Sequence, residues 1–330
     1  MNFWDKILNY YKFETNSNRD FIVKLHKNIN YIRGEYNKIN DDTIVNNDLK
    51  ESNNYEEILE KYINNNLITT RLGCIESKFL LYTYFETDLL ENNLKIIKSE
   101  NDYYMKKNAG LYYKNIEDKD KVINWWIENT LEIIKKSTLT SAYCFLHYDL
   151  LLWSYLDLKY NFYNWGNLHK LILKNSKNKK ILYIGNGTKS ISYSYNNKIY
   201  EKGWNFEIPK FELYCLKTPQ TTKNMNYPDD NMIITTNKII EEIENSYGDF
   251  DTAILGCGAY GPPITNILSK KFSNKNLIYL GSSCYYMFCV YSKGMPIPNE
   301  NDVNKNEWIE VLEDCDPRCK DIDQGKYWKT

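Results

Sequence analysis

Short runs of apolar residues alternate with glycine turns and amphipathic segments in the second half of the chain. Residues 181–184, 211–216, 252–255 and 276–280 form such runs, and each predicts a buried strand. Apolar spacing over residues 236–245 predicts an amphipathic helix, and Pro262-Pro263 begins a second helix that extends through Phe272. Because strand, turn, helix and strand follow one another, the pattern predicts a parallel α/β sheet.

The first half of the chain is more polar and reads mainly as helices. Residues 1 to about 60 have a helical pattern, broken by a loop-like stretch around residues 40–54. Residues 67–70 predict a short strand that enters a turn at 71–76, and residues 77–90 predict a helix after it. Residues 117–160, rich in Trp and Leu, predict two helices. We expect a helical segment over residues 1–66, then an α/β domain over 67–330 whose Rossmann-like half begins near residue 178.

Composition narrows the class of protein. The 330 residues are 42% hydrophobic, enough for a sizeable core, and 42 basic against 43 acidic side chains give a net charge of -1. That balance argues against a dedicated nucleic-acid binder. No run approaches the ~20 apolar residues of a membrane span, and the first 13 residues lack the apolar region of a signal peptide. We therefore expect a cytoplasmic protein whose cysteines are reduced.

Two glycine turns follow predicted strands. Gly256, Gly258 and Gly261 match G-x-G-x-x-G, a spacing that lets backbone N–H groups approach a phosphate. NAD binding also requires an acidic residue about 20 positions later, where this chain has Gly281 and Ser282. The turn therefore indicates either a contact to phosphate or ribose, or only a tight turn of the sheet.

The second turn, Gly185-Asn186-Gly187, is similar to the S-adenosylmethionine loop of methyltransferases. The strand before that loop usually carries an acidic residue, and residues 181–184 contain none. A methyltransferase and a plain turn at the end of a strand both stay open.

The turn from Arg71 to Glu76 combines three useful groups. Arg71 offers a planar fork for a phosphate, and Gly73 permits a close approach of the backbone. Glu76, in the first turn of the predicted helix, is suited to a ribose, a sugar hydroxyl or a divalent cation. The alternative is an Arg–Glu ion pair with an acidic group that suits the helix dipole.

Taken in order, these segments resemble the GT-D class of glycosyltransferases, including its bacterial and giant-virus-type members. The resemblance covers about residues 67–328 and lies in the segments 68–76, 108–112, 180–184, 217–221, 251–288, Trp308 and 327–328. It implies a Rossmann-like parallel sheet flanked by helices, with a helix-rich N-terminal part. A viral member would work in the host cytoplasm.

The resemblance also implies an activity. Enzymes of this class move a sugar from a nucleoside diphosphate sugar, most often a UDP-sugar, to a glycan or other acceptor. By resemblance, Arg71 and Glu76 are the catalytic residues. The residues expected to bind the nucleotide-sugar are Gly73, Asn108, Gly110, Gly185, Asn186, Gly256, Gly258, Ala259, Tyr260, Gly261, Gly281 and Ser282.

A metal ion is the last expectation that the resemblance raises. The founding enzymes bind a divalent cation through Asp-x-Glu, and this chain has Cys74-Ile75-Glu76 at that place. Mn²⁺ or Mg²⁺ prefers oxygen ligands, so Glu76 is the expected ligand and Arg71 would neutralise part of the charge. The cysteine also leaves open a non-catalytic binding or structural member of the fold.

Overall fold

The computed structural model of the protein describes residues 55–84, 102–142, 165–224, 227–298 and 301–314, together with residues 322 and 329. A six-stranded sheet lies at its centre, with strand order β2-β1-β6-β5-β3-β4 and parallel pairing throughout. Its strands are β1 (Ile68–Leu72), β2 (Leu139–Ala142), β3 (Lys180–Gly185), β4 (Glu212–Lys217), β5 (Thr252–Gly256) and β6 (Asn276–Tyr279). The predicted Rossmann-like α/β fold is thus confirmed.

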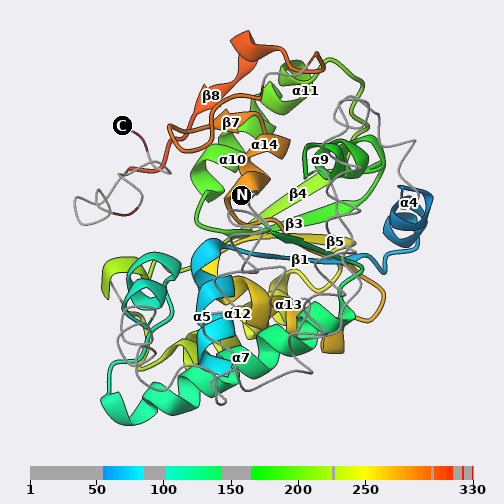
Figure 1. The fold of residues 1–330 in the computed structure, drawn as a ribbon. Coiled ribbons are helices and arrows are strands. Elements are labelled where there is room, and N and C mark those ends of the chain that lie inside the picture. Colours follow the sequence, from blue (N-terminus) through cyan, green and yellow to red (C-terminus); the bar gives the residue numbers. More distant parts are fainter. Residues whose placement is uncertain are drawn as a thin grey trace, which may run out of the picture.

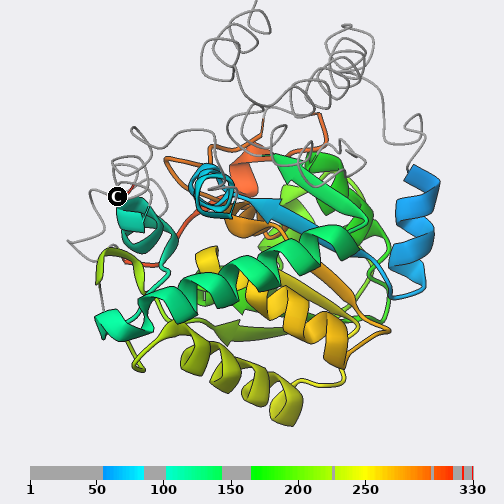
Figure 2. The same ribbon diagram turned by 60° about the horizontal axis from the view of Figure 1, so that its bottom comes forward.

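Helices cover both faces of this sheet (Figure 1). Above it in that view lie α9 (Trp165–Lys174), α10 (Thr188–Asn196), α11 (Ile199–Gly203) and α14 (Cys284–Met287). Below it lie α7 (Lys119–Lys136), α12 (Met232–Ser246) and α13 (Gly261–Lys271), which Figure 2 brings forward. Helix α4 (Tyr55–Ile63) precedes β1, and α5 (Cys74–Tyr84) follows it.

Short elements complete the fold. A second, two-stranded sheet pairs β7 (Val290–Tyr291) with β8 (Ile309–Glu310). The single-turn helices are η2 (Met105–Ala109), a π-helix, and the 3₁₀ turns η3 (Ile116–Asp118), η4 (Thr222–Asn224), η5 (Gly258–Tyr260), η6 (Gly281–Ser283) and η7 (Lys305–Glu307).

Two hydrophobic clusters lie on opposite faces of the sheet. Along β3, Leu182 and Ile184 belong to one cluster, and Ile181 and Tyr183 belong to the other. Side chains alternate between the two faces of a strand, so a strand that is covered on both faces reads as one continuous apolar run. This is why residues 181–184 are recognisable from the sequence.

Most predicted elements are present, with ends that shift by a few residues, but one prediction is partly wrong. Residues 117–160 were expected to form two helices, and α7 supplies the first. Residues 139–142 instead form β2, because Thr69 pairs with Leu139 and Leu72 pairs with Ala142. The rest of that stretch, residues 143–164, lies outside the described residues, as does the polar segment 1–54.

The order of the strands positions the functional site. The chain leaves β3 for β4 on one side and then returns to β5 on the other side of β3. In open parallel sheets, ligands bind at the carboxyl ends of strands where the direction of winding changes in this way. All six strands run from right to left in Figure 1, from α4 toward α5. Within the described segments, no helix is long and apolar enough to cross a membrane.

Candidate functional site

A pocket of about 350 Å³ opens at the carboxyl ends of the strands. Residues that follow β1, β3, β4, β5 and β6 contribute to its wall, together with the η2 segment. Predicted site residues that line the pocket are Arg71, Gly73, Glu76, Asn108, Gly110, Asn186, Gly256, Gly258, Tyr260, Gly281 and Ser282. Segments that are far apart in the sequence therefore meet at one site.

Three predicted binding residues do not line the pocket. Gly185 pairs with Gly256 inside the sheet, and a Cβ atom there would lie 2.6 Å from the Gly256 oxygen. Ala259 is fully buried, and its oxygen accepts a hydrogen bond of 2.8 Å from Trp126 Nε1. Gly261 begins α13 and packs against the ring of Tyr279. We assign these three residues to the framework of the turns.

The end of β1 and the start of α5 carry the charged residues of the pocket. Arg71 is 5% exposed, and its Nη1 donates a hydrogen bond of 2.5 Å to the oxygen of Leu280. Glu76, 8% exposed, lies in the first turn of α5, and its carboxyl carbon would be 3.2 Å from a Cβ atom at position 73. Gly73 is therefore required for the carboxylate to fold back over the turn.

Both charges act on Tyr279, which lies between them and the next turn. Burial raises the pKa of Tyr279 well above its ordinary value, and the negative charge of Glu76 raises it further. The positive charge of Arg71 lowers the same pKa. The Tyr279 hydroxyl is thus a neutral donor, and it gives its hydrogen bond to the oxygen of Gly258 at 3.0 Å.

The turn after β5 requires glycine. Gly258 has a φ of 55°, and a Cβ atom there would lie 2.7 Å from the oxygen of Ala109. Other residues adopt this left-handed conformation at a cost of about 1–2 kcal/mol. The close contact brings η2 against η5 and forms one wall of the pocket.

The turn after β3 is fixed from beneath. The amide of Gly187 donates a hydrogen bond of 3.1 Å to the hydroxyl of Tyr183, which is fully buried under the turn. Asn186 accepts a hydrogen bond of 2.9 Å from the hydroxyl of Thr218, the residue that follows β4. Tyr285 packs its ring against Gly187 and also lines the pocket.

The η2 wall is held by residues on either side of it. Gly110 ends η2 with a φ of 86°, and its oxygen accepts a hydrogen bond of 2.6 Å from the hydroxyl of Thr221. Beyond it, the oxygen of Tyr112 accepts from the amide of Met232 at 3.1 Å, and the amide of Lys114 donates to the oxygen of Asp230 at 2.7 Å.

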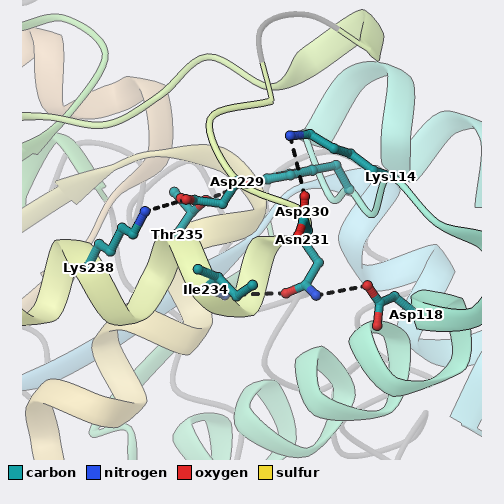
Figure 3. A network of polar contacts seen from close by, with 9 residues as sticks. Lys114, Asp118, Asp229, Asp230, Asn231, Ile234, Thr235 and Lys238 are labelled. Carbon is teal, nitrogen blue, oxygen red and sulfur yellow. Dashed lines mark hydrogen bonds and ion pairs between the residues drawn. The ribbon is translucent and has the colours of Figure 1, made fainter.

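Figure 3 shows the polar network that anchors this wall to α12. Asn231 accepts a hydrogen bond of 3.3 Å from the amide of Ile234, which caps the helix, and its amide group donates to Asp118 at 3.1 Å. Asp229 accepts from Lys238 and, at 2.8 Å, from the hydroxyl of Thr235. Thr235 also shares a hydrogen bond with the Tyr112 hydroxyl. The wall is therefore preorganised before any ligand binds.

Cys257 and Cys284 are poor candidates for chemistry at this site. Burial raises the pKa of Cys284 to about 12 and raises the pKa of Cys257, which lines the pocket, further still. Both thiols are therefore neutral at physiological pH, and a neutral thiol is neither a strong nucleophile nor a metal ligand.

Glu76 is the carboxylate through which the pocket wall can hold a cation. Among the described residues, no cluster of three or more His, Cys, Asp or Glu is present. Mg²⁺ is commonly bound through one or two carboxylates together with substrate phosphates. One carboxylate therefore fits a cation that arrives with a diphosphate.

Several lining residues were not predicted, namely Ile75, Ala109, Pro219, Gln220, Thr221, Thr222, Cys257, Tyr279, Tyr285 and Ile322. The segment 219–222 could have been found from its place directly after a predicted strand. Tyr279 and Tyr285 carry no signal in the sequence, because the chain contains 30 tyrosines.

Protein-family models, curated proteins and solved structures contain no match to this chain. The functional interpretation therefore depends on the geometry of the pocket and on the resemblance in the sequence.

Proposed function

We propose that the protein is a glycosyltransferase that transfers a sugar from a nucleoside diphosphate sugar, such as a UDP-sugar, to a glycan or other acceptor. The observation that carries this proposal is the convergence of four separate turns on one pocket. The turns after β1, β3, β5 and β6 hold Gly73, Asn186, Gly258 and Gly281, and all four residues line it. Three of these turns, those after β1, β5 and β6, lie in segments where the chain resembles the GT-D class.

The chemical task of such an enzyme is to stabilise the leaving diphosphate. Negative charge grows on the diphosphate as the bond between sugar and oxygen breaks. Arg71 supplies a positive charge beside the pocket and also fixes the turn at Gly281 through Leu280. Helices α5 and α13 begin at the pocket, and the N-terminal end of a helix favours an anion.

Glu76 has the second role. Its carboxylate is held over Gly73, inside the pocket and near the positive charge of Arg71. We propose that Glu76 binds a hydroxyl of the donor or a Mg²⁺ or Mn²⁺ ion that accompanies the diphosphate. A cation bound there would neutralise phosphate charge, while Arg71 would keep the turn around it in place.

A thermal-shift screen tests this proposal. The purified protein is heated with UDP-, GDP-, dTDP- and CMP-sugars, each with Mn²⁺ and with EDTA. A ligand at 100 times its dissociation constant adds about 2.7 kcal/mol to the stability of the folded state, which is a visible rise in melting temperature. The proposal expects a rise with one class of nucleotide-sugar.

S-adenosylmethionine is included in the same screen to test the methyltransferase alternative. A rise in melting temperature with that ligand alone would support a methyltransferase. No rise with any nucleotide-sugar would favour a non-catalytic member of the fold.

A further inference from the structure

Two polar atoms at the pocket wall are buried without a hydrogen-bond partner. They are the hydroxyl oxygen of Tyr260 and the amide oxygen of Asn108. Tyr260 is 2% exposed, and its hydroxyl lies near Thr221 and Tyr112 without a well-formed hydrogen bond to either. Buried polar atoms almost always have a partner, so these two atoms point to a ligand that supplies the missing hydrogen bonds.

The surroundings of these atoms are uncharged. Beside Tyr260 and Asn108, this part of the wall consists of Gly110 and the segment 219–222. Segment 219–222 follows β4, which is separated from β1 by three strands of the sheet. Arg71 lies in β1 and Glu76 follows that strand, so the pocket has a charged side toward β1 and an uncharged, hydrogen-bonding side toward β4.

The uncharged side of the pocket can discriminate between ligands, because the wall that forms it is rigid. Thr221 holds Gly110, and Tyr112 is held in turn by Thr235 and Asp229 in the network of Figure 3. A site built to hydrogen-bond a ligand group discriminates strongly, because an analogue without that group leaves the buried atoms unpaired.

We propose that Asn108 and Tyr260 bind the nucleobase of the donor, with its diphosphate directed toward Arg71. This inference rests on the proposed function. A nucleobase edge carries N–H and C=O groups side by side, and an amide with an adjacent hydroxyl can pair with both. Pro219 and the aliphatic part of Gln220 offer an apolar surface for the flat ring.

Isothermal titration of Tyr260→Phe against two ligands tests the inference. The first ligand is the tightest of UDP, CDP, GDP and ADP for the wild type, and the second is inorganic pyrophosphate, which has no base. We expect the nucleoside diphosphate to bind about tenfold more weakly and the pyrophosphate to bind as before. Asn108→Leu should have the same pattern. Tyr195→Phe is the matched control, since its hydroxyl donates to the oxygen of Phe211 away from the pocket.

The melting temperature of the unliganded protein gives an independent readout. Tyr260→Phe removes a hydroxyl that has no partner, so the variant should melt at the same temperature as the wild type or higher. If the Tyr260 hydroxyl contributed only to folding, Tyr260→Phe would melt at a lower temperature than the wild type.

Each contrary result has a distinct meaning. Equal weakening of both ligands, or unchanged binding of the nucleoside diphosphate, would overturn the nucleobase assignment and leave the donor pocket standing. A nucleotide-sugar titrated as a third ligand would place the sugar at this side if it alone bound more weakly to Tyr260→Phe, and that result would overturn the assignment as well. If the wild type binds pyrophosphate but no nucleoside diphosphate, the inference and the proposed function both fall.

Discussion

Arg71 and Leu280 are joined by a buried hydrogen bond of 2.5 Å, although 209 positions separate them in the chain. The bond ties the end of β1 to the turn after β6, the strand beside β1 in the sheet. Glycine is favoured at position 281 next to it, because its φ of 59° is left-handed and a Cβ atom there would clash with Nη1 of Arg71. One side chain thereby sets the shape of the charged side of the pocket.

Replacement of Arg71 should therefore affect both folding and binding. Arg71→Met removes a hydrogen bond from a charged group and leaves the buried Leu280 oxygen without it, which lowers the free energy of unfolding by about 2–3 kcal/mol. Urea denaturation measures this loss. Arg71→Lys keeps the charge but not the planar fork, so it should recover donor binding only in part. An Arg71→Met variant as stable as the wild type would contradict the described role.

Gly258 should tolerate no side chain. Gly258→Ala combines a left-handed φ of 55° with a contact of 2.7 Å to the Ala109 oxygen, so we expect a loss of more than about 2 kcal/mol in unfolding free energy. Gly248→Ala is the comparison variant, because Gly248 is not in the left-handed conformation and its Cβ atom would make a milder contact, 3.1 Å from the oxygen of Glu244. Equal melting temperatures for the two variants would show that the η2–η5 contact is not as tight as described.

A substitution outside the pocket should weaken the hydrogen bonds that hold the η2 wall in place. Thr235→Val removes the hydroxyl that connects Tyr112 to Asp229, at a cost of about 1–2 kcal/mol in unfolding free energy. It should also weaken nucleotide binding, although the pocket wall does not include Thr235. Asp249→Asn, which breaks only a surface ion pair with Lys180, serves as the control and should change neither. Unchanged nucleotide affinity in Thr235→Val would mean that the wall does not need this support.

His169 should make stability depend on pH. It is fully buried, and burial together with the nearby charge of Arg71 lowers its pKa from 6.5 to about 3. Below pH 6.5 the unfolded chain binds a proton at this position that the folded protein does not bind until near pH 3, so stability falls as the pH falls through this window. Between pH 7 and pH 5 the loss from this group is about 2 kcal/mol.

The variant His169→Gln tests this assignment, because it keeps a polar side chain but cannot titrate. Urea denaturation at pH 7 and pH 5 should give a smaller drop in stability for the variant than for the wild type. The same drop in both proteins would assign the pH dependence to other groups.

The local features of the fold could be predicted from the sequence, whereas the long-range contacts could not. The turn at Arg71 and the turn at Gly258 are recognisable, because each follows an apolar run and contains glycine. Nothing local indicates that Gly258 meets Ala109 or that Arg71 reaches Leu280, since sheet order brings these pairs together. Strand β2 was missed for the same reason, because its pairing with β1 decides its conformation.

The spacing of the glycines also predicted more binding residues than line the pocket. Gly185 and Gly261 belong to the same turns as Asn186 and Gly258, but they serve the packing of strand and helix instead of lining the pocket. A motif therefore identifies the turn, and the fold decides which of its residues face the ligand.

The most direct test of the central claim is the release of nucleoside diphosphate from a nucleotide-sugar, compared between the wild type and Glu76→Gln. The proposed function predicts release by the wild type with one class of donor. It also predicts a rate at least about tenfold lower for Glu76→Gln, measured well below the melting temperature of both proteins, because the variant keeps the size of the side chain and loses its charge. Equal rates in the two proteins, or no release with any nucleotide-sugar tested, would contradict the claim that this pocket is the active site of a glycosyltransferase.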